Sequence, residues 1–337
     1  MSPRNPSVTA QDVARLAGVS RAVVSRALSS NGSISPDARA RVLRAAEELG
    51  YQVNFLAQGL NRQRSHLIGV IVSRISDPFR SALLDALLNE IQRQGFQALV
   101  SEIHSEQDLA HTLRRFTQFR VSGVIVTSGQ PPEALVNECV QQHIPVVGIN
   151  RQPTIPGVDY VCSDNVAGAE LAADQLLRSG CRRFGWLNHS PSTWAGRMRG
   201  EAFSRALQAR GVDVERNLAI LACPEEGYTG GFQAAALADE ALEGIFCANA
   251  QIACGFLDGM RQRGKQAPED YQLIGFDNTP PTAQYSYQLT TLHQDVAAIS
   301  RQALARLQER TVDPLQPSRT TWVEVTLIHR RTSPFII

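Results

Sequence analysis

The chain has 337 residues and an almost neutral formal charge of +1, from 33 basic and 32 acidic side chains. This length is enough for a small module together with one large or two medium-sized domains. The absence of any run of about 18 apolar residues argues against a membrane-spanning helix, and the opening MSPRNPSVTAQD has no apolar signal-peptide core. We therefore expect a cytoplasmic protein that does not enter a membrane.

Positive charge is concentrated at the start of the chain. Residues 1–66 contain nine arginines and four acidic residues, a net charge of +5, whereas the remainder carries −4. A basic module attached to a slightly acidic body is typical of proteins that bind nucleic acids.

The first predicted helix follows Thr9. Asp12, three residues later, completes the pattern of a capping box, and Gly18 is expected to end the helix. Apolar residues at helical spacing define its predicted buried face, which consists of Val13, Leu16 and Ala17.

A second helix is predicted after Ser20, a good N-cap residue, and a third between the cap Ser35 and Gly50. The buried face expected for the second helix is Val23, Val24, Ala27 and Leu28, and that of the third is Val42, Ala45, Ala46 and Leu49. The outward residues of the second helix are then Arg21, Ala22, Ser25 and Arg26. This is the helix-turn-helix pattern, in which the second helix enters the DNA major groove.

Beyond residue 66, strand-like and helical segments alternate. Strands are predicted at 67–73, 96–102, 123–128, 145–150, 184–188, 244–249 and 271–277, with helices notably at 79–94, 165–179, 197–210 and 251–263. Continuously apolar strands separated by helices indicate parallel sheets covered on both faces.

No metal or cofactor is expected. The histidines are scattered, and the six cysteines, Cys139, Cys162, Cys181, Cys223, Cys247 and Cys254, lack metal-ligand spacing. We interpret these cysteines as reduced structural thiols. The sequence also contains no dinucleotide-binding, Walker or nucleophile-elbow motif, which argues against an enzyme.

Several motifs in register resemble the LacI/GalR family of bacterial transcriptional regulators. They are QDVARLAGVSRAVVSRAL, ELGYQVNFLAQGL, LIGVIVS, DPFRSALLDALLNEIQRQGF, VSGVIVTS, SDNVAGAELAADQLLRSG, LIGFDN and LTTLHQD. The resemblance implies a small all-α helix-turn-helix domain followed by an α/β periplasmic-binding-protein-like body of two doubly wound lobes. The domains would be 1–53, a hinge helix and linker at 54–65, and a body at 66–337. The implied N-lobe is about 66–164 and 294–322, and the implied C-lobe is about 165–291 and 323–337.

The resemblance also assigns DNA contacts. Base-reading positions would be Arg21, Ala22, Arg26 and Leu60, and phosphate-binding positions would be Thr9, Ser20, Ser25 and Asn54. An arginine can donate two hydrogen bonds to guanine, although a phosphate contact remains the alternative for both arginines. Leu60 matches the hinge leucine that wedges into the minor groove, and a core leucine is its alternative.

The hinge departs from the family pattern at Gly59, which costs a helix about 1 kcal/mol relative to alanine. We therefore expect the hinge to be unfolded without DNA and to fold on binding.

The resemblance places a small-molecule effector between the lobes. Candidate effector contacts are Phe79, Arg80, Trp194, Arg197, Arg199, Asn249 and Asp277. Arg80 stands where a second pocket aromatic is usual, and Ala250 replaces a usual aspartate. If Arg80 and Arg199 converge, they favour a sugar acid or sugar phosphate, because guanidinium groups pair with carboxylate and phosphate. Alternatively, Arg80 projects to solvent or to a dimer partner.

The predicted function is that of a homodimeric, sequence-specific transcriptional regulator that binds double-stranded operator DNA. Repression is the default, activation remains open, and the effector could release or promote DNA binding. The chain ends at LIHRRTSPFII without a heptad tail, so we expect a dimer and not a tetramer. The alternatives are a sugar-binding receptor of the same body fold and an α/β enzyme.

Overall fold

A computed structural model describes residues 8–28, 34–52, 65–127, 133–190 and 192–335. The chain divides into two compact units, Met1–Ser65 and His66–Ile337. None of the helices in these described ranges is both long and apolar enough to cross a membrane.

The first unit contains three helices, α1 (Ala10–Ala17), α2 (Arg21–Ala27) and α3 (Pro36–Glu48). The Asp12 carboxylate accepts hydrogen bonds from the backbone N–H of Thr9 (3.0 Å) and from its Oγ1 (2.7 Å), which fixes the start of α1. Gly18 ends α1 with a left-handed φ of 63°. Ser20 and Ser35 cap the other two helices by accepting from the N–H groups of Val23 and Ala38.

The buried face of α1 differs from the prediction. Val13 and Ala17 are buried as expected, but the third buried residue is Ala14, and Leu16 is 47% exposed. On a helix, Ala14 and Leu16 flank the direction shared by Val13 and Ala17 at equal angles, so periodicity alone could not choose between them. The packed core of the three helices consists of Val13, Ala14, Ala17, Val24, Ala27, Val42, Ala45 and Ala46. Val23, Leu28 and Leu49 pack against its edge.

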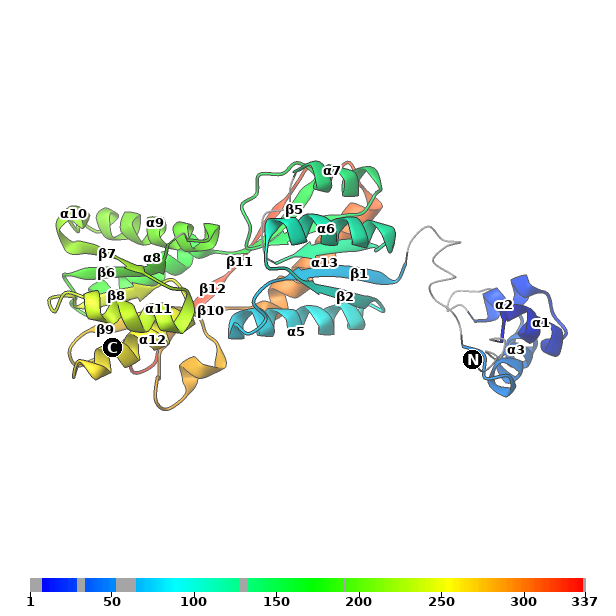
Figure 1. Ribbon diagram of the computed structural model, residues 1–337, viewed down its shortest axis with the longest axis horizontal. Helices are drawn as coiled ribbons and strands as arrows, with labels where there is room; N and C mark the ends of the chain where they lie inside the picture. The colour runs from blue at the N-terminus through cyan, green and yellow to red at the C-terminus, as the bar shows by residue number, and fades with distance from the viewer. Residues whose placement is uncertain (1–7, 29–33, 53–64, 128–132, 191, 336–337) are drawn as a thin grey trace. The chain divides into compact units, whose positions relative to one another are not determined.

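The second unit has two lobes, each built on a six-stranded sheet with helices on both faces (Figure 1). The N-lobe strands are β1 (Leu67–Val72), β2 (Gln97–Glu102), β3 (Gly123–Val126), β4 (Val146–Ile149), β5 (Val158–Ser163) and β11 (Thr320–Val323). Their order is β11-β5-β4-β3-β1-β2, and all neighbours are parallel. The central register places Gly69 opposite Leu99 and Val124.

The N-lobe helices are α5 (Pro78–Arg93), α6 (Glu106–Gln118), α7 (Glu133–Gln141) and α13 (Val296–Val312). Leu87 of α5 and Leu304 of α13 belong to the core on one face of the sheet. Leu113 of α6 and Val136 of α7 belong to the core on the other face. The apolar strands are therefore buried on both sides, as their composition predicted.

The C-lobe strands are β6 (Phe184–His189), β7 (Leu218–Cys223), β8 (Gly244–Cys247), β9 (Gln272–Asp277), β10 (Thr290–Gln294) and β12 (Val325–Ile328). Their order is β12-β10-β9-β8-β6-β7, with only the β10–β12 pair antiparallel. Its helical segments are α8 (Asn165–Arg178), α9 (Trp194–Ala209), α10 (Val214–Asn217), α11 (Gly227–Ala234), η1 (Ala235–Leu237), α12 (Ala250–Gln262) and η2 (Pro280–Ala283).

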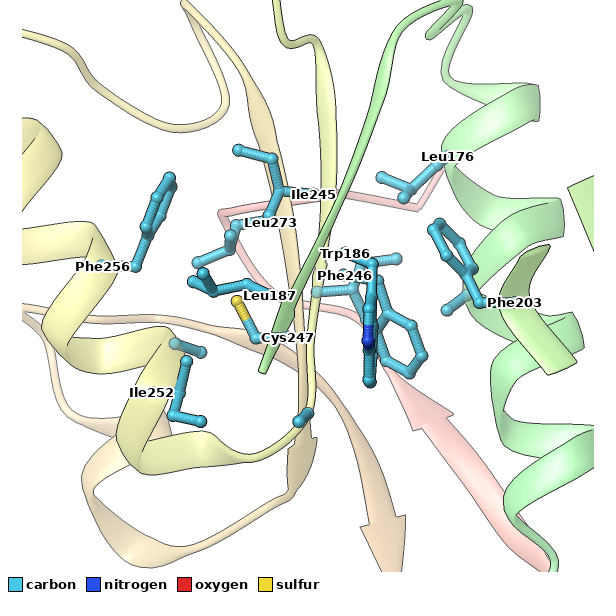
Figure 2. Packing of buried hydrophobic residues seen from close by; sticks show 14 of the residues in the cluster. Leu176, Trp186, Leu187, Phe203, Ile245, Phe246, Cys247, Ile252, Phe256 and Leu273 are labelled. Carbon is cyan, nitrogen blue, oxygen red and sulfur yellow. The ribbon is translucent and has the colours of Figure 1, made fainter. Parts of the chain in front are cut away.

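The C-lobe core fills both faces of its sheet (Figure 2). On one face, the ring of Phe246 lies 5.1 Å from those of Trp186 and Phe203, measured between centroids. On the other, Phe256 and Ile252 of α12 pack toward the strands. All six cysteines are buried without disulfides. Burial raises their pKa, for example to about 11 for Cys139, which disfavours the thiolate form.

The chain passes between the two lobes three times, at Asp164, Asp295 and Glu324. The last two crossings lie slightly later than predicted, because β10 extends in the C-lobe sheet to Gln294 and β11 in the N-lobe sheet to Val323. Strand ends depend on pairing with neighbouring strands, which the apolar pattern does not reveal.

Candidate functional site

The outward face of α2 is exposed and basic. Arg21, Ala22, Ser25 and Arg26 are all exposed, and α2 contains no acidic residue. Arg26 Nε donates a hydrogen bond to the Ala22 carbonyl (3.3 Å), which restricts the conformation of the side chain. Two guanidinium groups on one short exposed helix suit contacts with guanine edges or phosphates.

The other predicted DNA contacts divide into two groups. Thr9 and Ser20 lie at helix N-termini, where both also serve as caps. Asn54 and Leu60, together with the expected folding of the hinge, fall outside the residues that the structure describes.

A cavity of about 360 Å³ lies between the two lobes of the body. Its lining includes residues at or just after the carboxyl ends of five parallel strands, among them Thr127, Arg151, His189, Asn249 and Asp277. In doubly wound α/β folds ligands bind at this edge of the sheet, since the loops there converge and carry polar groups.

Asp277 forms the polar centre of the C-lobe wall. It ends β9 with a φ of 91°, and its carboxylate accepts hydrogen bonds from Gln294 Nε2 (2.6 Å) and from the Ala250 N–H (3.4 Å). Burial raises the pKa of Asp277 to about 6, although the nearby Arg199 lowers it. Asn249 lies beside it and caps α12 by accepting from the Ile252 N–H (2.9 Å).

Arg199 is committed to the protein itself. It is only 6% exposed. Its Nε donates to Asn165 Oδ1 (2.7 Å) and its Nη1 to the Ala248 carbonyl (2.6 Å), with Asp277 Oδ1 at 3.8 Å. Its guanidinium also stacks over the Phe276 ring, 3.4 Å from the centroid. Arg199 therefore supports Asp277 as a positive neighbour, and two of its five N–H groups are bonded within the C-lobe.

The N-lobe wall brings together three arginines. Arg80 lies in the first turn of α5, where its Nη1 donates to the Ser73 carbonyl (3.0 Å), and Phe79 lines the cavity beside it. Arg151 follows β4, and Arg74 follows β1 and forms an ion pair with Glu226 of the C-lobe. Sequence reasoning did not single out Arg151. Its place directly after the strand-like run PVVGIN was the signal that could have identified it.

Two predicted effector contacts, Trp194 and Arg197, do not line this cavity in the described structure, whereas Ala195, Gly196 and Arg199 of the same helix do. Trp194 packs on the N-lobe core and lies 6.4 Å from the Trp322 ring. Arg197 is exposed and donates to the Ser192 carbonyl (2.8 Å). Helical geometry explains the difference, because residues 194 and 197 share a side of α9 that 195 and 199 do not.

Gln294 connects the two walls. Its Nε2 donates to Asp277, while its Oε1 accepts from Ser163 Oγ (2.5 Å) and Asn150 Nδ2 (3.2 Å) of the N-lobe. The carboxylate at the cavity is therefore hydrogen-bonded, through one side chain, to Ser163, which directly precedes the crossing at Asp164.

A basic helix-turn-helix unit joined to a two-lobed α/β body with a polar interlobe cavity defines a ligand-responsive DNA-binding regulator. Residues 9–54 match the bacterial regulatory proteins of the lacI family, and residues 173–333 match a periplasmic binding protein-like domain. The chain belongs to the LacI family, as the resemblance predicted.

Curated relatives agree over almost the whole length. The chain is 31% identical to the HTH-type transcriptional regulator GalS of Salmonella typhimurium, over 96% of each chain. It is 30% identical to GalR of Escherichia coli, over 96% of this chain and 95% of GalR. These relatives are transcriptional regulators and not enzymes.

Solved structures show the same fold. The lac repressor dimer bound to operator and an anti-inducer has a TM-score of 0.83 at 22% identity, over 98% of this chain and 100% of that one. A LacI-family regulator from Enterococcus faecium with bound ribose has a TM-score of 0.72 at 26% identity, over 80% of this chain and 100% of that one.

Proposed function

We propose that this protein is a cytoplasmic transcriptional repressor that binds a pseudo-palindromic operator as a homodimer. One α2 from each copy enters the major groove, with Arg21, Ala22 and Arg26 reading bases and Thr9, Ser20, Ser25 and Asn54 contacting phosphates. Leu60 enters the minor groove at the centre of the site. The chain has no catalytic role.

A small molecule in the interlobe cavity controls DNA binding in this proposal. Asp277 accepts hydrogen bonds from its hydroxyl groups, and the Asn249 amide nitrogen donates to them. Closure of the lobes around the ligand changes how the two hinge segments approach each other. A coupling of about 1–3 kcal/mol between the two sites is typical of such regulators.

The observation that carries the proposal is the presence, in one chain, of the exposed basic face of α2 and of a polar cavity at the carboxyl ends of two sheets. Neither a sugar-binding receptor nor an enzyme needs the exposed basic face of α2. The operator named for the lac repressor structure and the ribose named for the Enterococcus faecium structure support the two halves of the proposal.

The DNA half is tested by selecting tight-binding duplexes from a randomised library with the full-length protein at fixed salt. We expect a pseudo-palindrome. Arg26→Ala should lower affinity for the selected site about 5–150-fold and relax the preference at one position of each half-site, because one bidentate base contact is worth about 1–3 kcal/mol. Ser25→Ala should weaken binding to all sequences equally.

Arg44→Ala is the matched control, since Arg44 is an exposed arginine on α3 whose loss changes the unit's charge by the same amount. Equal losses for Arg26→Ala and Arg44→Ala, without a change of sequence preference, would contradict base reading by α2. Sedimentation equilibrium tests the assembly. A mass of two chains is expected, and a mass of one or four would overturn the dimer.

A further inference from the structure

We propose that the N-lobe wall of the cavity is an anion subsite formed by Arg80 and Arg151, with Arg74 at its rim. The effector is then a polyhydroxylated molecule that carries a carboxylate or phosphate at the end facing the N-lobe. This inference rests on the proposed role of the cavity as the effector site, and it names the chemical class of the effector.

Arg151 is the strongest indication. Its side chain lines the cavity and donates from Nη2 to the Thr127 carbonyl, while its Nε is buried without a hydrogen-bond partner in the described structure. A buried guanidinium nitrogen without a partner costs free energy, because the N–H has lost water and gained nothing. An anionic ligand against the guanidinium would offset this cost through its charge and its acceptor oxygens.

Arg80 is held in place beside it. The Asp77 carboxylate caps α5 by accepting from the Arg80 backbone N–H (3.0 Å), and the Arg80 side chain is tied to Ser73 through both the carbonyl and the hydroxyl. These bonds fix the guanidinium at the cavity before any ligand arrives. A preorganised guanidinium loses less side-chain entropy on binding than a flexible surface arginine does.

Mutual repulsion among these arginines adds a second argument. Burial, together with the charges of Arg80 and Arg74, lowers the pKa of Arg151 to about 10. Burial and Arg74 also lower the pKa of Arg80. Glu226 pairs with Arg74, and Asp77 and Asp277 offset part of the charge of Arg80. The repulsion between Arg80 and Arg151 remains in the empty site, and a bound anion relieves it.

Arg199 is not part of this subsite. It lies on the C-lobe wall, where two of its N–H groups bond to Asn165 and Ala248 and the carboxylate of Asp277, 3.8 Å away, offsets its charge. The sequence hypothesis paired Arg80 with Arg199 as the anion clamp, whereas the structure places Arg151 and Arg74 with Arg80. The ionised Asp277 on the C-lobe wall repels an anion, which orients the ligand with its hydroxyl groups toward Asp277 and Asn249.

The cavity suits a ligand of about monosaccharide size, since 360 Å³ lies at the lower end of the range for small-molecule sites. Acceptors on one wall and cations on the other match a sugar acid or a sugar phosphate. A neutral sugar would satisfy Asp277 and Asn249 but would offer Arg80 and Arg151 only uncharged acceptors, which bind a guanidinium less strongly than a carboxylate or phosphate does.

The test is isothermal titration of the full-length protein with inorganic phosphate and with sugar acids, sugar phosphates and their neutral parent sugars. We expect measurable binding of inorganic phosphate, and at least one anionic sugar that binds 10-fold or more tightly than its neutral parent. Arg151→Gln and Arg80→Gln should each lower the affinity for that anionic sugar about 10-fold or more, because each variant loses charged hydrogen bonds to it.

Arg178→Gln is the matched control, because it removes one positive charge from an exposed position of the same body outside the cavity, and the affinity of this variant should stay within about 2-fold of wild type. Unfolding followed by tryptophan fluorescence verifies that each variant is folded. Arg151→Lys is a second variant, which keeps the charge without the fork and should bind with intermediate affinity.

Equal binding of neutral and anionic sugars would overturn the anion subsite while leaving the cavity as the effector site. Unchanged affinity in both Arg151→Gln and Arg80→Gln would also overturn the anion subsite. So would the failure of every compound, including inorganic phosphate, to bind. The operator selection is independent of these ligands, so failure of the regulatory function would be recognised separately.

Discussion

Replacing Arg199 with leucine should destabilise the body strongly, and more at neutral than at acidic pH. The substitution removes the hydrogen bonds to Asn165 Oδ1 (2.7 Å) and the Ala248 carbonyl (2.6 Å) and leaves Asp277 without its positive neighbour. Breaking a buried charge pair from one side costs about 3–5 kcal/mol, because the remaining charge stays buried. We expect a loss of that size at pH 7.5.

The pH dependence follows from Asp277. Its pKa in the folded protein is raised from 3.8 to about 6, so the folded state binds a proton more tightly than the unfolded state. Stability from this group is therefore present at low pH and is lost as the pH rises between about 3.8 and 6. Without Arg199 the pKa of Asp277 rises further, so the loss of folding stability continues to a higher pH.

The assay is urea unfolding at pH 5 and pH 7.5, followed by tryptophan fluorescence, since all three tryptophans lie in the body. The deficit of Arg199→Leu should be larger at pH 7.5, by about 1.4 kcal/mol per unit of additional pKa shift. The double variant Arg199→Leu/Asp277→Asn should lack this pH-dependent part of the stability loss, because it has no carboxyl group to titrate. A deficit below about 1 kcal/mol, or one that is equal at both pH values, would refute the coupling.

Two further predictions concern packing. In the first unit, Val13→Ala should lower stability by about 1–3 kcal/mol, whereas Leu16→Ala should change it by no more than about 0.5 kcal/mol, because only Val13 is buried. Amide hydrogen exchange of α1 and α3 measures the stability change of both variants. Equal losses of stability would contradict the exposure of Leu16. In the body, a Cβ added at Gly255 would lie 2.0 Å from the Tyr228 carbonyl oxygen, so α11 and α12 would have to separate. Gly255→Ala should therefore cost about 1–3 kcal/mol in urea unfolding, with the exposed Gln262→Ala as control. An unchanged midpoint for Gly255→Ala would show that the contact is loose.

Much of the fold could be predicted because it depends on local patterns. Capping residues such as Ser20 and the apolar periods of the helices and strands are read along a few residues of chain. The position of Asp277 at a strand end was also visible in the motif LIGFDN, and in a parallel sheet that position already implies the ligand edge. The element types, the helix-turn-helix and this one carboxylate therefore needed no tertiary information.

The composition of the cavity was decided by the tertiary structure. Arg74, Arg80 and Arg151 come from loops after β1 and β4 and from the first turn of α5, and only the strand order β4-β3-β1 brings them to one wall. Arg199 looks equivalent in the sequence, yet α9 places it on the C-lobe wall, where it donates to Asn165 and Ala248 and lies beside Asp277. Hydrophobic periodicity records which side of a segment is buried. It does not record which distant segment lies opposite, and the partners of a charged side chain depend on that arrangement.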